Sequence, residues 1–135
     1  MKNFILLCLA FITLPEKLSS QIYFRHYQVD QGLSSNTITS IHQDKNGFIW
    51  MGTRNGLNRF DGNHFKLYKT DKNDSLSIGS HSINTICEDN TGGLWIGTYN
   101  GIYLYDYKTE GFKQISGDYP FVQDLHTDSD NSIRF

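Results

Sequence analysis

Two acidic turns contain residue types that could begin a calcium-binding loop. Asp44 and Asn46 lie two positions apart, as do Asp128 and Asp130. A complete calcium loop needs further oxygen ligands at fixed spacing and a closing glutamate, and neither turn supplies them. A second copy of the first turn has Thr91 where Asn46 stands. We therefore predict no metal site and expect these side chains to cap tight turns.

The other residues that could act as ligands, nucleophiles or acid–base groups form no catalytic pattern. The histidines share no ligand spacing and have no cysteine or acidic cluster beside them: His26, His42, His64, His81 and His126. The chain also lacks a G-x-S-x-G motif, a phosphate-binding glycine loop and a pair of carboxylates spaced for catalysis. The sequence therefore predicts a protein without catalytic residues and without a cofactor, and not an enzyme.

Two tryptophans, Trp50 and Trp95, could present flat aromatic surfaces to a sugar ring. Each lies in a copy of one 24-residue segment, since the residues from Ile38 onward align with those from Ile83 onward after a shift of 45 positions. Ten of the 24 positions are identical. Stacked repeats bury a continuous core between neighbouring units. We therefore predict that both tryptophans pack between repeats.

Each repeat has the pattern of four short strands separated by turns. In the first copy the expected strands cover residues 37–43, 48–53, 57–60 and 65–68. The Asn55-Gly56 pair predicts a type I′ hairpin turn, in which both central residues have positive φ. Four antiparallel strands in a period of about 40–50 residues are typical of a β-propeller blade. The predicted fold is all-β, a partial β-propeller with two four-stranded blades.

The expected blades cover residues 37–68 and 83–115, with residues 69–82 as the loop between them. Residues 21–36 resemble the fourth strand of the repeat and its lead-in. We expect them to form an outer strand that completes the last blade of a closed ring. Residues 122–135 resemble the beginning of a third blade but lack its glycine and tryptophan. The chain is therefore interpreted as a fragment, with a truncated gene or a pseudogene remnant as alternatives.

Residues 1–20 have the pattern of an export signal. Lys2 precedes an apolar run of eleven residues, and Ser19 and Ser20 provide small residues for cleavage. The rest of the chain has no comparable run. The net charge of −2 gives no electrostatic reason to expect nucleic acid as a partner. We expect a periplasmic protein segment that binds no nucleic acid.

The tandem segments GLSSNTITSIHQDKNGFIWMGTRNGLNRFDGNHFKLYK and SLSIGSHSINTICEDNTGGLWIGTYNGIYLYD resemble the two-component regulator propeller repeat. The resemblance covers about residues 23–114. It implies the periplasmic sensor region of a hybrid two-component regulator, a protein class common in gut Bacteroidetes. In that family the ectodomain usually has two large propellers and an immunoglobulin-like domain. One membrane helix then connects it to a histidine kinase, a receiver and a DNA-binding region inside the cell.

The resemblance implies a non-catalytic sensing module that detects oligosaccharides and controls polysaccharide-utilisation genes. It also implies three features of the full-length sensor: further blades that complete the ring, an anchor in the inner membrane, and a homodimer. None of the family's catalytic parts matches this chain. A fragment of a secreted propeller enzyme, such as a quinoprotein, or of a glycan-binding lectin is the alternative interpretation.

Arg54 and Tyr99 are the candidate ligand-binding residues. They occupy matched positions in the turn between the second and third strands of the two repeats. With four strands in each blade, these turns and the connections between blades emerge on the same face of a propeller. Variable loops on a rigid scaffold are a frequent place for binding sites. The alternative is that both residues belong to ordinary solvated turns.

Overall fold

The structure is a computed structural model that describes residues 22–116 and 121–135. Two antiparallel sheets of four strands dominate it, and each sheet keeps the order of the chain. The first sheet, blade 1, contains β1 (Ile38–Gln43), β2 (Ile49–Thr53), β3 (Gly56–Phe60) and β4 (Phe65–Tyr68). The second, blade 2, contains β5 (Ile83–Glu88), β6 (Leu94–Thr98), β7 (Gly101–Asp106) and β8 (Gly111–Ser116). The predicted all-β fold with two four-stranded antiparallel units is confirmed.

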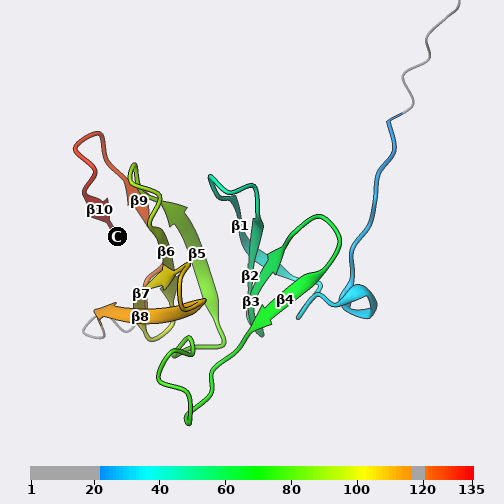
Figure 1. The fold of residues 1–135 in the computed structure, drawn as a ribbon, viewed down its shortest axis with the longest axis horizontal. Coiled ribbons are helices and arrows are strands. Elements are labelled where there is room, and N and C mark those ends of the chain that lie inside the picture. Colours follow the sequence, from blue (N-terminus) through cyan, green and yellow to red (C-terminus); the bar gives the residue numbers. More distant parts are fainter. Residues whose placement is uncertain (1–21, 117–120) are drawn as a thin grey trace, which may run out of the picture.

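The two blades stand beside each other like neighbouring wedges, joined by the long connection from β4 to β5 (Figure 1). Strand β5 packs against β1 and β2 of the preceding blade. Strand register is also repeated, because Trp50 pairs with Arg59 in β3 and Trp95 pairs with Leu104 in β7. Equal registers place equivalent side chains on equivalent faces.

The core lies between the two sheets. Its buried members come from both blades and include Trp50, Leu57, Tyr68, Ile83, Ile86, Leu94, Ile96, Tyr103, Tyr105 and Phe112. A second, smaller cluster of Ile102, Val122 and Leu125 covers the other face of blade 2. Burial of apolar surface at about 25 cal/mol per Å² makes these contacts between blades the main stabilising term of the fold.

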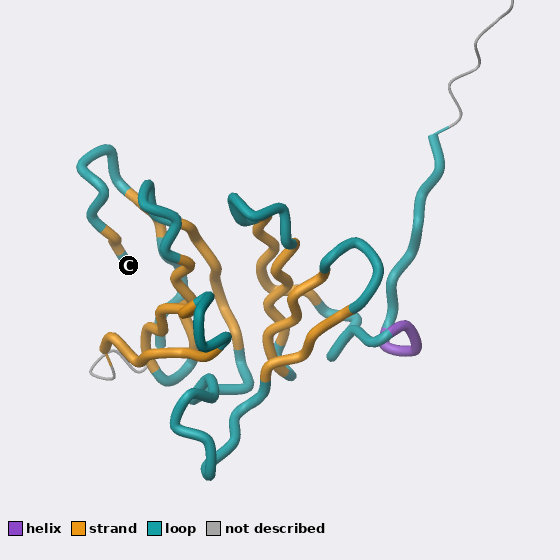
Figure 2. The backbone as a smooth tube through the Cα atoms, viewed as in Figure 1, coloured by secondary structure: helices purple, strands orange, loops and turns teal. Residues whose placement is uncertain are grey.

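Outside the blades, a short hairpin of β9 (His126–Thr127) and β10 (Ile133–Arg134) lies beside β5, and the 3-10 helix η1 (Val29–Gln31) lies near blade 1 (Figure 2). Residues 22–28 form no strand, and the beginning of this segment extends away from the blades (Figure 1). The outer strand expected within residues 21–36 was assigned to the last blade of a closed ring, so it stays a prediction. Ring contacts hold Tyr27 against Phe60 and Phe65, with centroids 4.8 and 5.5 Å away. The expected export signal, residues 1–20, lies outside the described residues.

Glycine at the end of the second strand allows the blades to approach closely. A Cβ atom on Gly52 would lie 2.7 Å from the side chain of Ile83 in blade 2. The equivalent Gly97 faces Val122, where a Cβ would meet the side chain at 2.8 Å. The repeated glycine therefore sets the spacing between neighbouring units.

The predicted type I′ turn is wrong. Gly56 and Gly101 have φ values of +123° and +121°, whereas neither Asn55 nor Asn100 is among the described residues with positive φ. The left-handed residue is thus the glycine that opens the third strand, and Asn serves the turn through its side chain.

Candidate functional site

The aspartate of each repeat anchors the tryptophan of the same repeat. One carboxylate oxygen of Asp44 accepts hydrogen bonds from the backbone N–H groups of Asn46 and Phe48, at 2.9 and 3.0 Å. The other oxygen accepts bonds from the indole Nε1 of Trp50 at 2.7 Å and the hydroxyl of Tyr107 at 2.8 Å. The carboxylate is almost completely buried. Its acceptor positions are therefore used within the protein.

The second copy repeats this arrangement at a more exposed position. Asp89 accepts bonds from the backbone of Thr91 and Gly93 and from the indole of Trp95, the last at 2.7 Å. Burial raises the pKa of Asp89, but the hydrogen bonds from Thr91, Trp95 and Gly93 outweigh it and lower the pKa to about 2. Among residues 22–116 and 121–135, no group of three His, Cys, Asp or Glu side chains could hold a metal ion.

Both tryptophans occupy equivalent places between units. Trp50 is fully buried, and its ring meets Tyr105 of blade 2 edge-on, with centroids 4.7 Å apart. Trp95 packs against the cluster that contains Val122 and Leu125, and it is half-buried. The predicted packing between repeats is confirmed, so the tryptophans are not exposed platforms for a sugar.

The turn between the second and third strands is fixed by the Thr-x-Asn-Gly residues of the repeat. The hydroxyl of Thr53 donates to the carbonyl of Gly56, and it accepts from the backbone N–H of Asn55. The Asn55 amide donates to the carbonyl of Ser34 at 3.0 Å. Blade 2 repeats all three bonds, with Asn100 reaching Gly79 at 3.1 Å. Each turn is therefore held rigidly.

These turns bring the two predicted ligand residues to one place. Arg54 and Tyr99 line the same hollow, of about 410 Å³, which we call the turn-face hollow. Its other lining residues are Thr39, Ser82, Asn84, Phe121 and Gln123. The rings of Tyr99 and Phe121 meet edge-on with centroids 5.7 Å apart, and both side chains are 57% exposed. A ligand role for Arg54 and Tyr99 remains a prediction.

A second hollow adjoins the first. It has a volume of about 420 Å³ and shares Arg54, Ser82 and Tyr99 with the turn-face hollow. The connection from β4 to β5 supplies most of its other lining residues, including Lys72 and His81. We call it the linker hollow. The sequence did not indicate Lys72, His81 or Phe121, because the conformation of the connecting loops decides whether these residues lie beside Arg54 and Tyr99.

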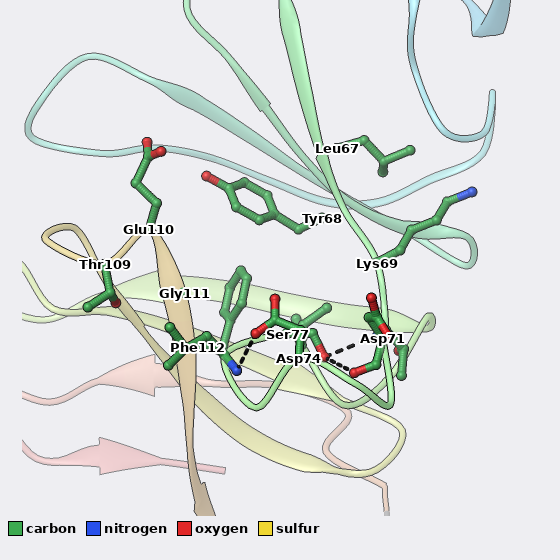
Figure 3. A pocket seen from close by; sticks show the side chains of 13 residues that line it. Leu67, Tyr68, Lys69, Asp71, Asp74, Ser77, Thr109, Glu110, Gly111 and Phe112 are labelled. Atoms are coloured by element: carbon green, nitrogen blue, oxygen red, sulfur yellow. Dashed lines mark hydrogen bonds between the residues drawn. The ribbon is translucent and has the colours of Figure 1, made fainter.

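A third hollow, of about 460 Å³, lies at the outer rim between β4, the linker and the start of β8 (Figure 3). Several of its polar side chains are engaged in the fold, whereas the buried hydroxyl of Thr70 has no hydrogen-bond partner among the described residues. Ser77 donates to the Asp71 carbonyl at 2.7 Å, and the Leu76 backbone N–H donates to Asp74 at 2.9 Å. Glu110 is paired with Lys66 at 2.6 Å. The hollow thus has no arrangement of a nucleophile with a base, and it was not predicted from the sequence.

A polar network also crosses the interface between the blades. The guanidinium of Arg59 lies 2.8 Å from Glu110 and 3.0 Å from the hydroxyl of Tyr105, and Tyr105 contacts the hydroxyl of Tyr68 at 2.8 Å. Burial lowers the pKa of Arg59, but its bond to Glu110 and the nearby hydroxyls raise it overall. Burial also raises the pKa of Tyr68 far above its ordinary value. These groups serve as permanent hydrogen-bonding partners between blades.

Comparison with known proteins agrees with the repeat geometry. A family profile described as "two component regulator propeller" matches residues 32–55 and 77–100. Each match ends on the Asn of a turn between the second and third strands, Asn55 or Asn100, and the two matches are 45 residues apart. The chain is built from two-component regulator propeller repeats. Its two sheets are therefore propeller blades, and the predicted family resemblance is confirmed.

Solved structures of similar fold support the assignment. The extracellular domain of a hybrid two-component system from B. thetaiotaomicron has a TM-score of 0.70 and 32% identity, over 79% of this chain and 16% of that chain. A second hybrid two-component extracellular domain from the same organism has a TM-score of 0.57 and 28% identity, over 73% and 15%. A sequence relative, "Histidine kinase P4" of Formosa agariphila, is 45% identical over 60 residues.

The chain spans only a small part of these relatives, since its match covers 4% of the histidine kinase and about a sixth of each extracellular domain. Within the described residues, no helix is long and apolar enough to cross a membrane.

Proposed function

We propose that the chain supplies propeller blades to the extracytoplasmic ligand sensor of a hybrid two-component system. The observation that carries this proposal is the pair of repeat-matched blades superimposable on the extracellular domain of such a system, at a TM-score of 0.70. The name of the sequence relative, a histidine kinase, agrees with a kinase elsewhere in the parent protein. In this proposal the blades bind the ligand and transmit the binding signal to the kinase, which carries out the catalysis.

The proposed setting is the periplasm, with the parent protein anchored in the inner membrane and active as a homodimer. Further blades would close the ring against the apolar face of blade 1, where Ile41 is 67% exposed although its counterpart Ile86 is 6% exposed. A ligand changes the signalling state only if it binds one arrangement of the propellers more tightly than another.

The proposed ligand is an oligosaccharide that binds on the face where the turns between the second and third strands emerge. The turn-face hollow combines an exposed aromatic pair with amide, hydroxyl and guanidinium groups. Aromatic rings pack on the C–H faces of sugars, while polar groups bond their hydroxyls. Arg54 and Tyr99 are the proposed contacts. The volume of about 410 Å³ falls within the range of small-molecule sites, about 300–1,000 Å³.

A thermal-shift screen of oligosaccharides with the complete ectodomain tests this proposal. We expect a stabilising oligosaccharide whose effect is lost in Arg54→Ala and Tyr99→Ala and kept in Lys113→Ala, a control on the exposed part of β8. A ligand that stabilises both Arg54→Ala and Tyr99→Ala as much as the unmodified protein would contradict the placement of the site. A secreted enzyme that turns over the added sugar would favour the alternative interpretation.

A further inference from the structure

The turn-face hollow and the linker hollow adjoin each other, and their described linings include basic side chains but no acidic ones. We call the surface that contains both hollows the turn face. Arg54 lines both hollows, and Lys72 and His81 line the linker hollow. No described Asp or Glu residue lines either hollow, although the chain has 14 acidic residues and a net charge of −2. The third hollow has the opposite character, because Asp71, Asp74 and Glu110 line it and Lys69 is the single basic residue in its described lining. Among the described residues, positive charge is therefore concentrated at the turn face, although the chain as a whole has a net negative charge.

The basic side chains that line these two hollows are also available to a ligand. Arg54, Lys72 and His81 are all exposed. In the part of the chain that the structure describes, none of their side chains makes a hydrogen bond or an ion pair. Arg59 is the contrasting case, since it is committed to Glu110 and Tyr105 across the blade interface. A planar guanidinium without a partner is suited to two parallel bonds with a carboxylate or sulfate group.

The groups beside Arg54 suit a ring that carries such an anion. Tyr99 and Phe121 present an exposed aromatic corner, and their hollow is continuous with Arg54. Gln123 adds an amide group to the same lining, and Asn84 lines it while its own amide nitrogen donates to the carbonyl of Val122 at 2.8 Å. The backbone of Tyr99 in this corner is held in place, because its N–H donates to the carbonyl of Ser82 at 3.2 Å. Preorganised contacts of this kind lower the entropic cost of binding.

We infer that the turn face recognises an acidic oligosaccharide, with a carboxylate or sulfate against Arg54 and a sugar ring against Tyr99 and Phe121. Lys72 extends the cationic surface along the linker, where the imidazole of His81 can also form a hydrogen bond, so the next acidic sugar of the chain lies there. This inference rests on the proposed function and adds the chemical class of the ligand to it.

The test compares ligands that differ only in charge, measured by titration calorimetry on the complete ectodomain. One pair is trigalacturonate and its fully methyl-esterified form, and the other is a sulfated disaccharide and its desulfated form. The protein variants are Arg54→Gln and Lys72→Gln, with Lys113→Gln as a control that removes the same charge from an exposed position outside both hollows.

We expect one acidic ligand to bind at least tenfold more tightly than its uncharged partner, and the pair that shows this difference identifies the anion as carboxylate or sulfate. Arg54→Gln should weaken its binding at least tenfold, Lys72→Gln about threefold, and Lys113→Gln less than twofold. Raising the salt concentration should weaken binding to the unmodified protein and change binding to Arg54→Gln less.

Three results would overturn the inference in distinguishable ways. If uncharged oligosaccharides bind as tightly as charged ones and Tyr99→Ala abolishes their binding, the sensor proposal stands and the acidic class is wrong. If no oligosaccharide of either charge binds, the proposed oligosaccharide function fails together with the inference. Equal losses in Arg54→Gln and Lys113→Gln would show a general charge effect and would also overturn it.

Discussion

Asp44→Asn keeps the size of the side chain and removes its charge, so it tests how the repeat holds its tryptophan. The amide oxygen of Asn can still accept from the backbone N–H groups of the turn. The amide nitrogen, however, then faces the indole N–H of Trp50, and two donors cannot bond to each other. The hydroxyl of Tyr107 can rotate and accept, so its contact can be kept.

The expected cost follows from what remains unpaired. A hydrogen bond to a charged group contributes about 1.5–3 kcal/mol, and a buried donor without an acceptor costs about 1–3 kcal/mol. Trp50 is 0% exposed and Asp44 is 4% exposed, so water cannot replace the lost acceptor. We expect Asp44→Asn to lower the free energy of unfolding by about 2–4 kcal/mol.

Asp89→Asn is the matched control because it makes the same chemical change in the second copy. Trp95 and Asp89 are both partly exposed. Among the described residues, no tyrosine hydroxyl bonds Asp89 as Tyr107 bonds Asp44. Water can therefore replace part of the lost bond, and we expect a cost of about 1 kcal/mol. Urea unfolding of the ectodomain followed by far-ultraviolet circular dichroism measures both costs. The reasoning is refuted if Asp89→Asn is as costly as Asp44→Asn.

Three other expected outcomes use the repeat in the same way. Because the pKa of Asp89 is depressed from 3.8 to about 2 in the folded state, its carboxylate stabilises the fold above about pH 4, and this contribution is lost as the pH falls to about 2. Acid titration of Asp89→Asn should show a weaker pH dependence in that window, and an unchanged profile would contradict the assignment. Gly52→Ala places a methyl group against Ile83 and should cost about 1–3 kcal/mol in thermal unfolding, whereas an unchanged melting temperature would show that the blades can separate without cost. In the isolated 135-residue chain, Ile86→Ala should cost about 2–4 kcal/mol and Ile41→Ala less than about 0.5 kcal/mol, because only the first of these side chains is buried; equal costs in chemical denaturation would rule out the unpaired face of blade 1.

The sequence was sufficient for the parts of the fold that depend on short spacing. Strand positions, antiparallel order and the equivalence of the two copies follow from the 45-residue repeat and its turn residues. The bond between Asp44 and Trp50 spans six residues, and the bond between Thr53 and Gly56 spans three. Such contacts form within one hairpin, so a local pattern determines them.

The turn conformation was the local feature that sequence reasoning missed. An Asn-Gly pair is compatible with more than one two-residue turn. The side-chain bond from Asn55 to Ser34 selects among them, and its partner lies 21 residues away. The outer strand expected within residues 21–36 stays a prediction, because its partner edge belongs to the last blade of a closed ring.

The composition of the candidate site was decided by tertiary structure. The repeat pattern selected Arg54 and Tyr99 as matched turn positions, but only the packing of the two blades places them on one hollow. Lys72 and Phe121 reach that face through the conformations of connecting segments, which differ in length between the repeats. The sequence by itself thus determined the repeating unit, because its contacts are local. The angle between units and the course of the linkers determined which charges and rings meet, because those contacts join residues far apart in the chain.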